Sequence, residues 1–325
     1  MPTMTASSAL APFLKTTLNT TNFEGLGERY EGKVRDVYIQ TEKGRRILIA
    51  TDRQSAFDIN WTTIPLKGQI LTQMSAWWFD QIGDIMATHV IAHPDPNVMI
   101  VKDLEMLKIE IVVRAYMTGS SKTSIWMNYK EGVREYCGNT LNDGMVKNQK
   151  LPKVLLTPTT KGKDDELIDP KGIIEGGFAT KARWEEIGDK ALKLFARGQK
   201  IALERGLILV DTKYEMGYDK EGNLTIADEV HTPDSSRYWI AGSYEQRFAA
   251  GQEPESLDKE FFRLWLKSQG FEYGGKHPAI TDEVRLMLAV KYIDLYERVT
   301  GQKFIVPTDP DVPGRIARNL REYRL

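Results

Sequence analysis

Cysteine is almost absent from this chain, which holds a single one, Cys137, among 325 residues. One cysteine can form neither a disulfide framework nor a cysteine-based zinc site. A lone cysteine is usually a small buried residue rather than a nucleophile. Histidine is also scarce, with four residues. We therefore expect chemistry that needs no covalent nucleophile.

An excess of charge of one sign is lacking too, because 44 Lys and Arg stand against 45 Asp and Glu. No global field then favours nucleic acid or an anionic membrane, and we expect neither as a partner. The longest apolar runs, such as Ile47–Ala50 and Leu207–Val210, fall far short of the roughly 20 residues that a membrane helix needs. The N-terminal residues have no basic stretch followed by a long apolar one, so we expect no signal peptide and a cytoplasmic location.

Several common nucleotide and hydrolase motifs are missing as well. The sequence has no G-x-x-x-x-G-K-[ST] loop, no kinase H-R-D or D-F-G signature and no G-x-S-x-G elbow. Gly25-Leu-Gly27 begins a G-x-G-x-x-G pattern, but Tyr30 occupies the third glycine position.

What the chain does have is the composition of a globular protein, with 41% hydrophobic and 27% charged residues. Its length indicates about two domains. Periodicity and β-forming residues predict a hairpin over residues 29–52, strands at Ile109–Met117 and Leu207–Val210, and helices over 69–86, 183–205, 258–269 and 282–299. This mixture predicts an α+β (mixed α/β) fold. Residues 157–177, rich in Gly, Pro and charge, are interpreted as a long irregular loop, either a functional lid or a solvated insertion.

The segment from Leu207 to Arg237 carries the strongest chemical signal. If its hairpin turn centres on Glu221 and Gly222, Glu215 faces Asp228 across the strands. Two opposed carboxylates repel, and Mg²⁺ is the simplest ion to neutralise them. Strand alternation also places Asp211, Lys213 and Glu215 on one face. The same row would equally suit the solvated face of a surface hairpin.

Two further clusters suit anions. Thr232–Arg237 gathers hydroxyls and a guanidinium, which can hold a phosphate or carboxylate, although a simple turn with a surface arginine has the same composition. Arg114 lies on an apolar strand that leads into Thr118–Ser121, for which we expect a helix N-terminus and an anion site. Plain N-capping of a helix by Ser120 or Ser121 would account for the same residues. Gly32, Lys33 and Arg35 begin a strand with two cations on one face.

Together these segments resemble the phosphoribosylaminoimidazole-succinocarboxamide synthase (SAICAR synthetase) family, in its longer, yeast-like form. The resemblance covers roughly residues 29–240 in order and rests on the motifs EGKVRDVY, LIATDRQSAFD, PLKGQILTQ, VVRAYMTGSS, GLILVDTKYEMG and IADEVHTPDSSR. It implies a two-lobed fold, with a β-rich N-terminal lobe similar to those of ATP-grasp enzymes and kinases and with ATP between the lobes. We assign residues 1–113 to the nucleotide-covering lobe and 114–325 to the larger lobe with the metal and ribonucleotide sites.

The resemblance also implies an activity and its site residues. The family joins the carboxylate of carboxyaminoimidazole ribonucleotide to L-aspartate with ATP in de novo purine biosynthesis. By position, Glu215 and Asp228 would hold Mg²⁺ at the ATP phosphates, which Gly32, Lys33 and Arg35 would cover. Arg114, Ser120 and Arg237 would grip the ribonucleotide phosphate, with Asp234 near that substrate. Asp211 and Lys213 would lie beside the nucleotide as catalytic residues, and Ser55–Asp58, with Ser55 and Asp58 as binding residues, is the candidate for L-aspartate. We expect a monomer or a small homo-oligomer.

Three other functions fit parts of this pattern. A small-molecule kinase would use the same Mg-ATP site but would release ADP without aspartate. A retaining glycosidase would use paired carboxylates but would need neither ATP nor the cations at Lys33, Arg114 and Arg237. A non-catalytic nucleotide-binding protein would bind ATP without turnover.

Overall fold

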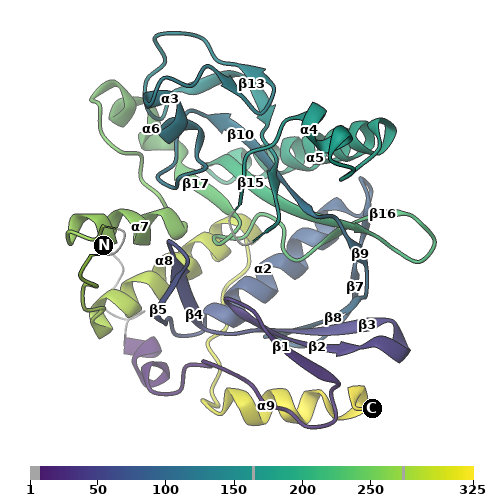
Figure 1. Ribbon diagram of the computed structural model, residues 1–325. Coiled ribbons are helices and arrows are strands. Elements are labelled where there is room, and N and C mark those ends of the chain that lie inside the picture. The colour runs from purple at the N-terminus through teal and green to yellow at the C-terminus, as the bar shows by residue number, and fades with distance from the viewer. Residues whose placement is uncertain (1–7, 163–164, 273–274) are drawn as a thin grey trace. The chain divides into compact units, whose positions relative to one another are not determined.

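The computed structural model describes residues 8–162, 165–272 and 275–325. Within it the chain forms two compact units (Figure 1). Unit 1 comprises the residues up to Asp80, His89–Asp103 and Phe261–Leu325, and unit 2 comprises Gln81–Thr88 and Leu104–Glu260. The predicted lobes, residues 1–113 and 114–325, are defined by their expected functions, namely covering the nucleotide and binding the metal and ribonucleotide. That functional division stays a prediction.

Unit 1 is built on a five-stranded sheet with the strand order β1-β2-β3-β8-β7. Its strands are β1 (Glu28–Glu31), β2 (Arg35–Gln40), β3 (Arg45–Ala50), β7 (Val90–Asp95) and β8 (Val98–Lys102). β2 and β3 pair antiparallel, and Gly44 turns the chain between them at φ 59°. The predicted hairpin is thereby confirmed. A separate antiparallel pair, β4 (Arg53–Ala56) and β5 (Ile59–Thr63), follows in the chain.

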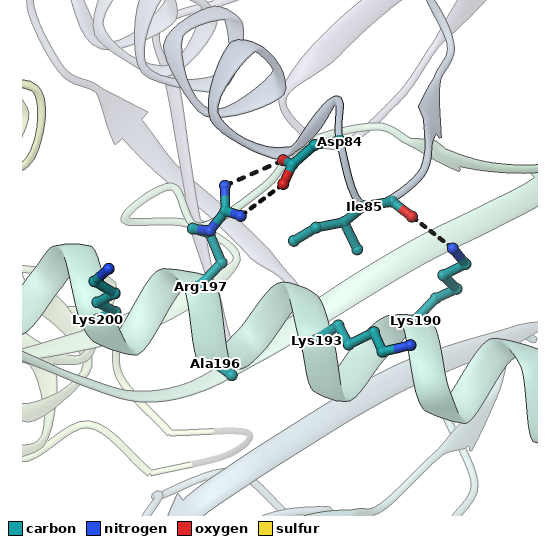
Figure 2. Close-up of a pocket in the computed structure, with 7 residues that line it drawn as sticks. All are labelled: Asp84, Ile85, Lys190, Lys193, Ala196, Arg197 and Lys200. Carbon is teal, nitrogen blue, oxygen red and sulfur yellow. Dashed lines mark hydrogen bonds and ion pairs between the residues drawn. The ribbon is translucent and has the colours of Figure 1, made fainter.

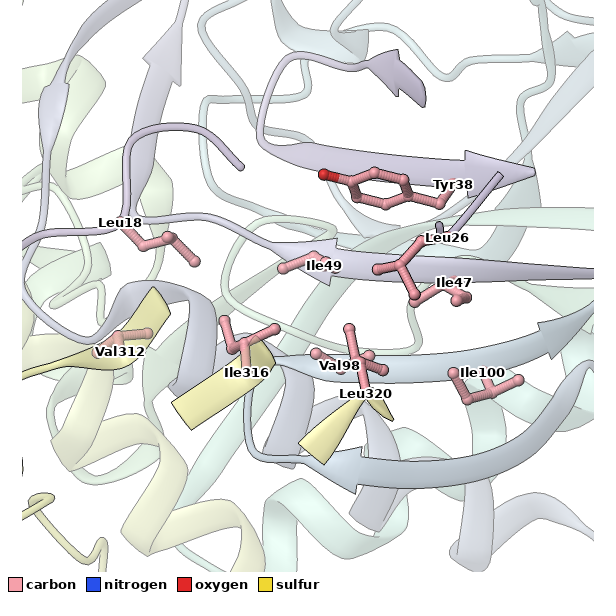
Figure 3. Packing of buried hydrophobic residues seen from close by; sticks show 10 residues of the cluster. All are labelled: Leu18, Leu26, Tyr38, Ile47, Ile49, Val98, Ile100, Val312, Ile316 and Leu320. Carbon is pink, nitrogen blue, oxygen red and sulfur yellow. The ribbon is translucent and has the colours of Figure 1, made fainter. Parts of the chain in front are cut away.

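The core of unit 1 joins this sheet to the C-terminal end of the chain (Figure 3). Tyr38, Ile47, Ile49, Val98 and Ile100 project from three neighbouring strands. The alternation of buried and half-buried residues along β2 is that of a strand with one face on the core. The residues that pack against them from outside the sheet are Leu18, Leu26, Val312 and Ile316 of the last α-helix, and Leu320, which directly follows that helix.

Unit 1 also contains the helices α2 (Lys67–Ile82), α7 (Lys259–Ser268), α8 (Asp282–Thr300) and α9 (Val312–Asn319). The last residues of α2 and the first of α7 belong to unit 2. The buried Asp52 carboxylate caps α2, because it accepts a hydrogen bond from the backbone N–H of Gly68 at 2.9 Å, and it also accepts one from the backbone N–H of Leu18 at 2.8 Å. Burial raises the pKa of Asp52 to about 6, against the lowering effect of those bonds.

Unit 2 is built around β15, which pairs with four other strands. Along the main path the strands are β13 (Lys150–Leu156), β10 (Ile109–Tyr116), β15 (Leu207–Tyr218), β16 (Leu224–Ala227) and β6 (Ala87–Thr88). β14 (Thr159–Thr160) pairs with β10, and β9 (Glu105–Met106) and β17 (Ser236–Ile240) pair with β15. A further small pair is β11 (Glu135–Tyr136) with β12 (Asn139–Thr140).

The 24-residue helix α5 (Lys181–Glu204) packs on β15 and β10 (Figure 1). Its N-cap is Thr180, whose hydroxyl accepts from the backbone N–H of Arg183 at 3.3 Å. Its buried residues recur at helical spacing, as a one-sided amphipathic helix requires. The shorter helices are α3 (Ile125–Lys130), α4 (Pro170–Glu175) and α6 (Ala241–Ala249). No helix in the part of the chain that the structure describes is long and apolar enough to cross a membrane.

The outer side of α5 carries a basic hollow of about 470 Å³ (Figure 2). It is lined by Asp84, Ile85, Lys190, Lys193, Ala196, Arg197 and Lys200. Lys190 donates to the carbonyl of Ile85 at 2.6 Å, and Arg197 donates to the carbonyl of Gln81 at 2.6 Å and pairs with Asp84. Two of these cations thus bind the backbone at the C-terminal end of α2, where positive charge is favoured. None of the predicted site residues lines the hollow.

The predicted mixed α+β class and the predicted long helices are confirmed, with ends that differ by a few residues. The interpretation of residues 157–177 as one irregular loop is wrong, because α4 lies within it. Asp169 is the N-cap of α4, with its side chain accepting from the backbone N–H of Gly172 at 2.7 Å, and Pro170 takes the first helical position. Both residues are ordinary helix-start signals that the loop-like composition concealed.

Candidate active site

The charged residues of β15 meet those of β10 on one face of the unit 2 sheet. Arg114 is the register partner of Asp211, and Val112 that of Lys213. The ammonium of Lys213 donates to Glu110 Oε1 at 2.7 Å and to Glu215 Oε1 at 3.3 Å. We call the six residues that share this side the charged face: Glu110, Arg114, Asp211, Lys213, Glu215 and Arg237.

A β-bulge in β15 aims Asp211 to this side. Leu209 pairs with Tyr238 and Asp211 pairs with Arg237, so Val210 is an extra residue on β15. Without a bulge, Leu209 and Asp211 would share a face, because strand residues alternate. Instead Leu209 turns toward α5, where its Cδ2 lies 2.6 Å from the place a Cβ would take at Gly198. The bulge therefore separates the apolar start of the strand from its charged middle.

Asp211 is the shared partner of two buried arginines. Its Oδ2 accepts from Arg114 Nη1 at 3.2 Å and from Arg237 Nη1 at 2.5 Å. Arg237 also donates to Glu260 Oε2 at 3.2 Å, and Arg114 donates from Nε to Thr157 Oγ1 at 2.9 Å. Burial would lower the pKa of Arg237, but Asp211 and Glu260 outweigh it and raise the pKa above its usual value. The Arg237 guanidinium is therefore charged, and hydrogen bonds fix both guanidiniums in place.

The loop after β10 lies against Arg237. A Cβ at Gly119 would stand 3.2 Å from Arg237 Nη2 and 2.4 Å from Ser124 Cβ, and the φ of Gly119 is 108°. Only glycine fits this position. Arg114 Nη2 donates to the carbonyl of Thr123 in the same loop at 3.3 Å. The loop that holds Ser120 thus contacts both Arg114 and Arg237, as predicted.

The helix expected directly after Thr118–Ser121 begins later than predicted. α3 starts at Ile125 with Ser124 as its N-cap residue. Ser124 instead uses its hydroxyl to donate to the carbonyl of Ser121 at 2.7 Å, within a turn. The expected helix N-terminus at residues 118–121 is therefore wrong. The anion site expected at this loop stays a prediction, and the positive charge beside it comes from Arg114 and Arg237.

The predicted register of the acidic hairpin is wrong by one residue. Glu215 pairs with Ala227, not Asp228. Residues 219–223 form a five-residue loop centred on Glu221, in which Asp219 accepts from the backbone N–H of Asn223 at 2.8 Å. Asp228 follows the end of β16 with a left-handed φ of 65°.

Asp228 nevertheless interacts electrostatically with Lys213, the same cation that Glu215 contacts. Burial would lower the pKa of Lys213, but Glu215, Glu110 and Asp228 together raise it above its usual value. Burial would raise the pKa of Glu215, but Lys213 and Lys161 lower it to about 2. Lys161, from the segment between β14 and α4, also forms an ion pair with Glu215. Glu215 is therefore ionised throughout the physiological pH range, and Lys213 is charged.

Lys161, Glu110 and Glu260 are parts of this site that the sequence reasoning missed. Glu110 could have been found, because it lies two and four residues before Val112 and Arg114 on a predicted strand. Lys161 and Glu260 are distant in sequence from their partners and carried no local signal. No group of three or more His, Cys, Asp or Glu that could hold a metal by itself is present within residues 8–162, 165–272 and 275–325.

Asp234 lies on the loop before β17, where Lys259 Nζ stands 3.5 Å from its Oδ2. Both side chains are largely buried, at 4% exposure for Asp234 and 13% for Lys259. The cation neutralises Asp234 within unit 2.

The remaining predicted residues belong to unit 1. Gly32 donates its backbone N–H to the carbonyl of Arg35 at 2.8 Å, which closes a tight turn around Lys33. The ammonium of Lys33 pairs with Asp58 at 2.6 Å, and both side chains are mostly exposed. An exposed pair contributes little to stability, so Lys33 can exchange Asp58 for a ligand at small cost.

Ser55 and Asp58 lie on the hairpin of β4 and β5. Ser55 is a buried strand residue paired with Asn60. Asp58 and its neighbour Phe57 form the two-residue turn, with φ of 60° and 52°. A two-residue turn between antiparallel strands commonly has positive φ at both central residues, so this geometry follows from the hairpin itself, although Phe57 takes a place where Asn, Asp or Gly is usual.

Comparisons with known proteins identify relatives of the whole chain. The SAICAR synthetase family profile matches residues 28–280. The chain is 49% identical to the chloroplastic phosphoribosylaminoimidazole-succinocarboxamide synthase of Arabidopsis thaliana, over 98% of this chain and 78% of the relative. It is 48% identical to the synthase of the same name from Legionella pneumophila strain Paris, over 91% and 96% of the two chains.

Solved structures agree with these sequence relatives. The SAICAR synthase from Saccharomyces cerevisiae complexed with SAICAR has a TM-score of 0.77 at 29% identity, covering 89% of this chain and 100% of that one. A type-2 SAICAR synthetase in complex with ADP has a TM-score of 0.65 at 26% identity, covering 86% and 100%. The predicted fold and the predicted resemblance are both confirmed.

Proposed function

Since the chain belongs to the SAICAR synthetase family, it is an ATP-dependent ligase that forms SAICAR in purine biosynthesis, and we propose that the charged face carries its chemistry. The enzyme joins the carboxylate of carboxyaminoimidazole ribonucleotide to the amine of L-aspartate and releases ADP and phosphate. The observation that supports this assignment best is the row Arg114–Asp211–Arg237, which fixes two charged guanidiniums side by side across three strands.

The reaction needs an activated carboxylate, because a carboxylate is a poor electrophile. In the proposed sequence, an oxygen of the ribonucleotide carboxylate takes the γ-phosphoryl group of ATP, which forms an acyl phosphate and ADP. The nitrogen of L-aspartate then attacks the acyl carbon, and phosphate leaves. The protein contributes by positioning the reactants and neutralising charge, which a face of fixed lysines and arginines can do.

Arg114 and Arg237 are proposed to bind the phosphate of the ribonucleotide, with Ser120 from the adjacent loop. Guanidiniums present forked donors that match phosphate oxygens. Arg237 Nε is buried and has no hydrogen-bond partner among the residues that the structure describes. A buried charged donor of this kind calls for an acceptor, and a phosphate oxygen would supply one. Asp234 is proposed to lie near the same substrate.

The ATP phosphates are proposed to be bound by Gly32, Lys33 and Arg35, together with Mg²⁺. Glu215 and Asp228 fit Mg²⁺, because this ion commonly takes one or two carboxylates plus phosphates and water rather than an all-protein cage. When bound, Mg²⁺ would neutralise phosphate charge. Lys213 would add its own positive charge beside the phosphates, while Asp211 would hold the arginines in orientation.

L-Aspartate is proposed to bind at Ser55–Asp58. The support is the exposed tip of this hairpin, where Asp58 pairs with the exposed cation of Lys33. We also propose a cytoplasmic location and a monomer or small homo-oligomer.

One experiment tests the proposed activity against a small-molecule kinase, which the comparisons do not favour. ADP release is measured with ATP and carboxyaminoimidazole ribonucleotide, with and without L-aspartate. A ligase should release ADP at a sustained rate only when aspartate is present, and SAICAR should form in equal amount. Equal ADP release in both conditions would contradict the assignment.

A further inference from the structure

The loop that joins β16 to β17, residues 228–235, carries a histidine that is wholly buried. His231 is 0% exposed. Its backbone is left-handed, with φ of 50°, and so is that of Asp228 at the start of the loop. Left-handed backbone at non-glycine residues costs free energy and persists only where the surroundings enforce it. The contacts of the His231 side chain and backbone must therefore stabilise this left-handed conformation.

Two buried tyrosines hold His231 from the sheet. The ring Nε2 is hydrogen-bonded to the hydroxyl of Tyr214 on β15. The hydroxyl of Tyr238 on β17 donates to the His231 carbonyl at 2.7 Å. Burial lowers the pKa of His231 to about 3, so the imidazole is neutral. Both the ring and the backbone of His231 are thereby tied to the strands that bear Asp211, Lys213 and Arg237.

Helix α5 closes the third side of the ring at Gly198. A Cβ at this position would stand 2.1 Å from His231 Cε1 and 2.4 Å from Nδ1. Glycine in a helix interior is less stable than alanine, so its presence here needs a reason. The close approach of the imidazole supplies one. The His231 ring is therefore seated between β15 and α5, on the side opposite the charged face.

The same loop carries acidic groups of the charged site. Asp228 acts on Lys213, whose backbone N–H donates to the carbonyl of Ser235 at 3.0 Å. Glu229 accepts a hydrogen bond from the hydroxyl of Thr232, next to His231. A shift of His231 would therefore move the backbone that presents Asp228, although His231 itself lies on the far side of the sheet.

We propose that His231, seated against Gly198 and bonded to Tyr214, is a positioning residue that fixes loop 228–235 so that Asp228 is held at the Lys213 and Glu215 centre. The proposal rests on the proposed role of Asp228 at the Mg-ATP phosphates. It assigns the histidine no contact with a substrate. It also explains two features together: the buried hydroxyl of Tyr214 bonds the His231 ring, and glycine at position 198 leaves room for it.

The test uses two variants and a matched control on the full chain. Tyr214→Phe removes the hydrogen bond and keeps the ring, while Gly198→Ala pushes the imidazole out of its seat. Gly188→Ala is the control, because it makes the same change on α5, where the new Cβ would meet only Leu156 Cδ1 at 3.1 Å. Two quantities are measured: hydrogen exchange of residues 228–235 without ligands, and the binding of ADP with Mg²⁺ and of the ribonucleotide by calorimetry.

We expect Tyr214→Phe to speed exchange in the loop and to weaken Mg-ADP binding by about 5- to 10-fold, the size of one hydrogen bond. Ribonucleotide binding should weaken clearly less than Mg-ADP binding, because Arg114 and Arg237, which are proposed to bind its phosphate, lie outside the loop, and only Asp234 within the loop is placed near that substrate. Gly198→Ala should do the same or more, and Gly188→Ala should do neither. If Gly198→Ala fails to fold, Tyr214→Phe alone decides.

Equal weakening of both ligands, or loop exchange in Tyr214→Phe equal to that of the unaltered chain, would overturn the positioning role. Failure of the proposed function is seen separately, since the unaltered chain would then show no aspartate-dependent ADP release.

Discussion

Replacement of Arg237 by methionine should selectively weaken binding of the ribonucleotide. Arg237 donates to Asp211 and Glu260 through its two terminal nitrogens, and its buried Nε is left for a ligand. One hydrogen bond from a charged group contributes about 1.5–3 kcal/mol. We therefore expect the KM for the ribonucleotide to rise roughly 10- to 150-fold. The KM for ATP should change by less than about threefold, because its phosphates are assigned to other residues.

The variant should still fold, because Asp211 keeps Arg114 as a partner at 3.2 Å. The loss in unfolding free energy should then lie nearer to the ~1.5–3 kcal/mol of a charged hydrogen bond than to the ~3–5 kcal/mol of a buried charge left alone. Both figures are below the ~5–15 kcal/mol by which most domains are stable. Urea unfolding of the variant checks this before any kinetic conclusion is drawn.

The assay is steady-state kinetics with each substrate varied at saturating levels of the other two. Arg237→Lys keeps the charge but loses the fork, so its KM for the ribonucleotide should fall between those of the other two enzymes. Arg134→Met is the control, because Arg134 stacks on Tyr129 and pairs with Asp143 at the surface of the same unit. If Arg237→Met raised the KM for ATP and left that for the ribonucleotide unchanged, the placement of the two phosphate sites would be reversed.

Three other perturbations follow from the structure. Glu215→Gln and Asp228→Asn should each lower kcat/KM by roughly 100- to 1,000-fold with an unchanged circular dichroism spectrum, and near-normal turnover of both at limiting Mg²⁺ would refute the metal assignment. Residues 157–177, of which 163–164 lie outside the described part of the chain, should exchange amide hydrogens more slowly with ATP and ribonucleotide bound, since Lys161 reaches Glu215 from this segment; unchanged exchange would make the segment a passive insertion. Asp52 has a pKa raised to about 6, so its contribution to stability is present at pH 4 and lost as the pH rises through 6. Relative to Asp52→Asn, the unfolding free energy of the unaltered chain should fall by about 2.4 kcal/mol between pH 4 and pH 7, and a difference that is constant with pH would contradict this.

The part of the site that depends on strand alternation could be predicted from the sequence. Lys213 and Glu215 share a face with Asp211 because the period of a strand is two residues and β15 is regular from Asp211 onward. Arg114 stood out for a similar reason, since a charged residue inside an apolar strand must find a partner. The partner is Asp211, ninety-seven residues away in sequence.

The parts that could not be predicted depend on single-residue geometry. The pairing of Glu215 with Asp228 failed because the turn holds five residues, and a change of one residue in a turn shifts every pair in the hairpin. The seat of His231 depends on a contact with Gly198, and the chain carries no local pattern that joins a histidine in a loop to a glycine in a helix. Lys161 reaches Glu215 from a segment whose composition suggested only an irregular loop.

The extra residue at Val210 also determines where β15 can tolerate an inserted or deleted residue. Because of it, Leu209 faces α5, whereas Asp211, Lys213 and Glu215 face the charged side, so one continuous strand contributes to both an apolar layer and a charged one. Deletion of Val210 would restore strict alternation and force either Leu209 toward the charged side or Asp211 toward the helix. The turn at residues 219–223, at the far end of the same strand, has no such constraint on its exposed side chains. Insertions at the tip of that turn that leave β15 and β16 in register should therefore be tolerated, whereas changes in length in the middle of the strand should not.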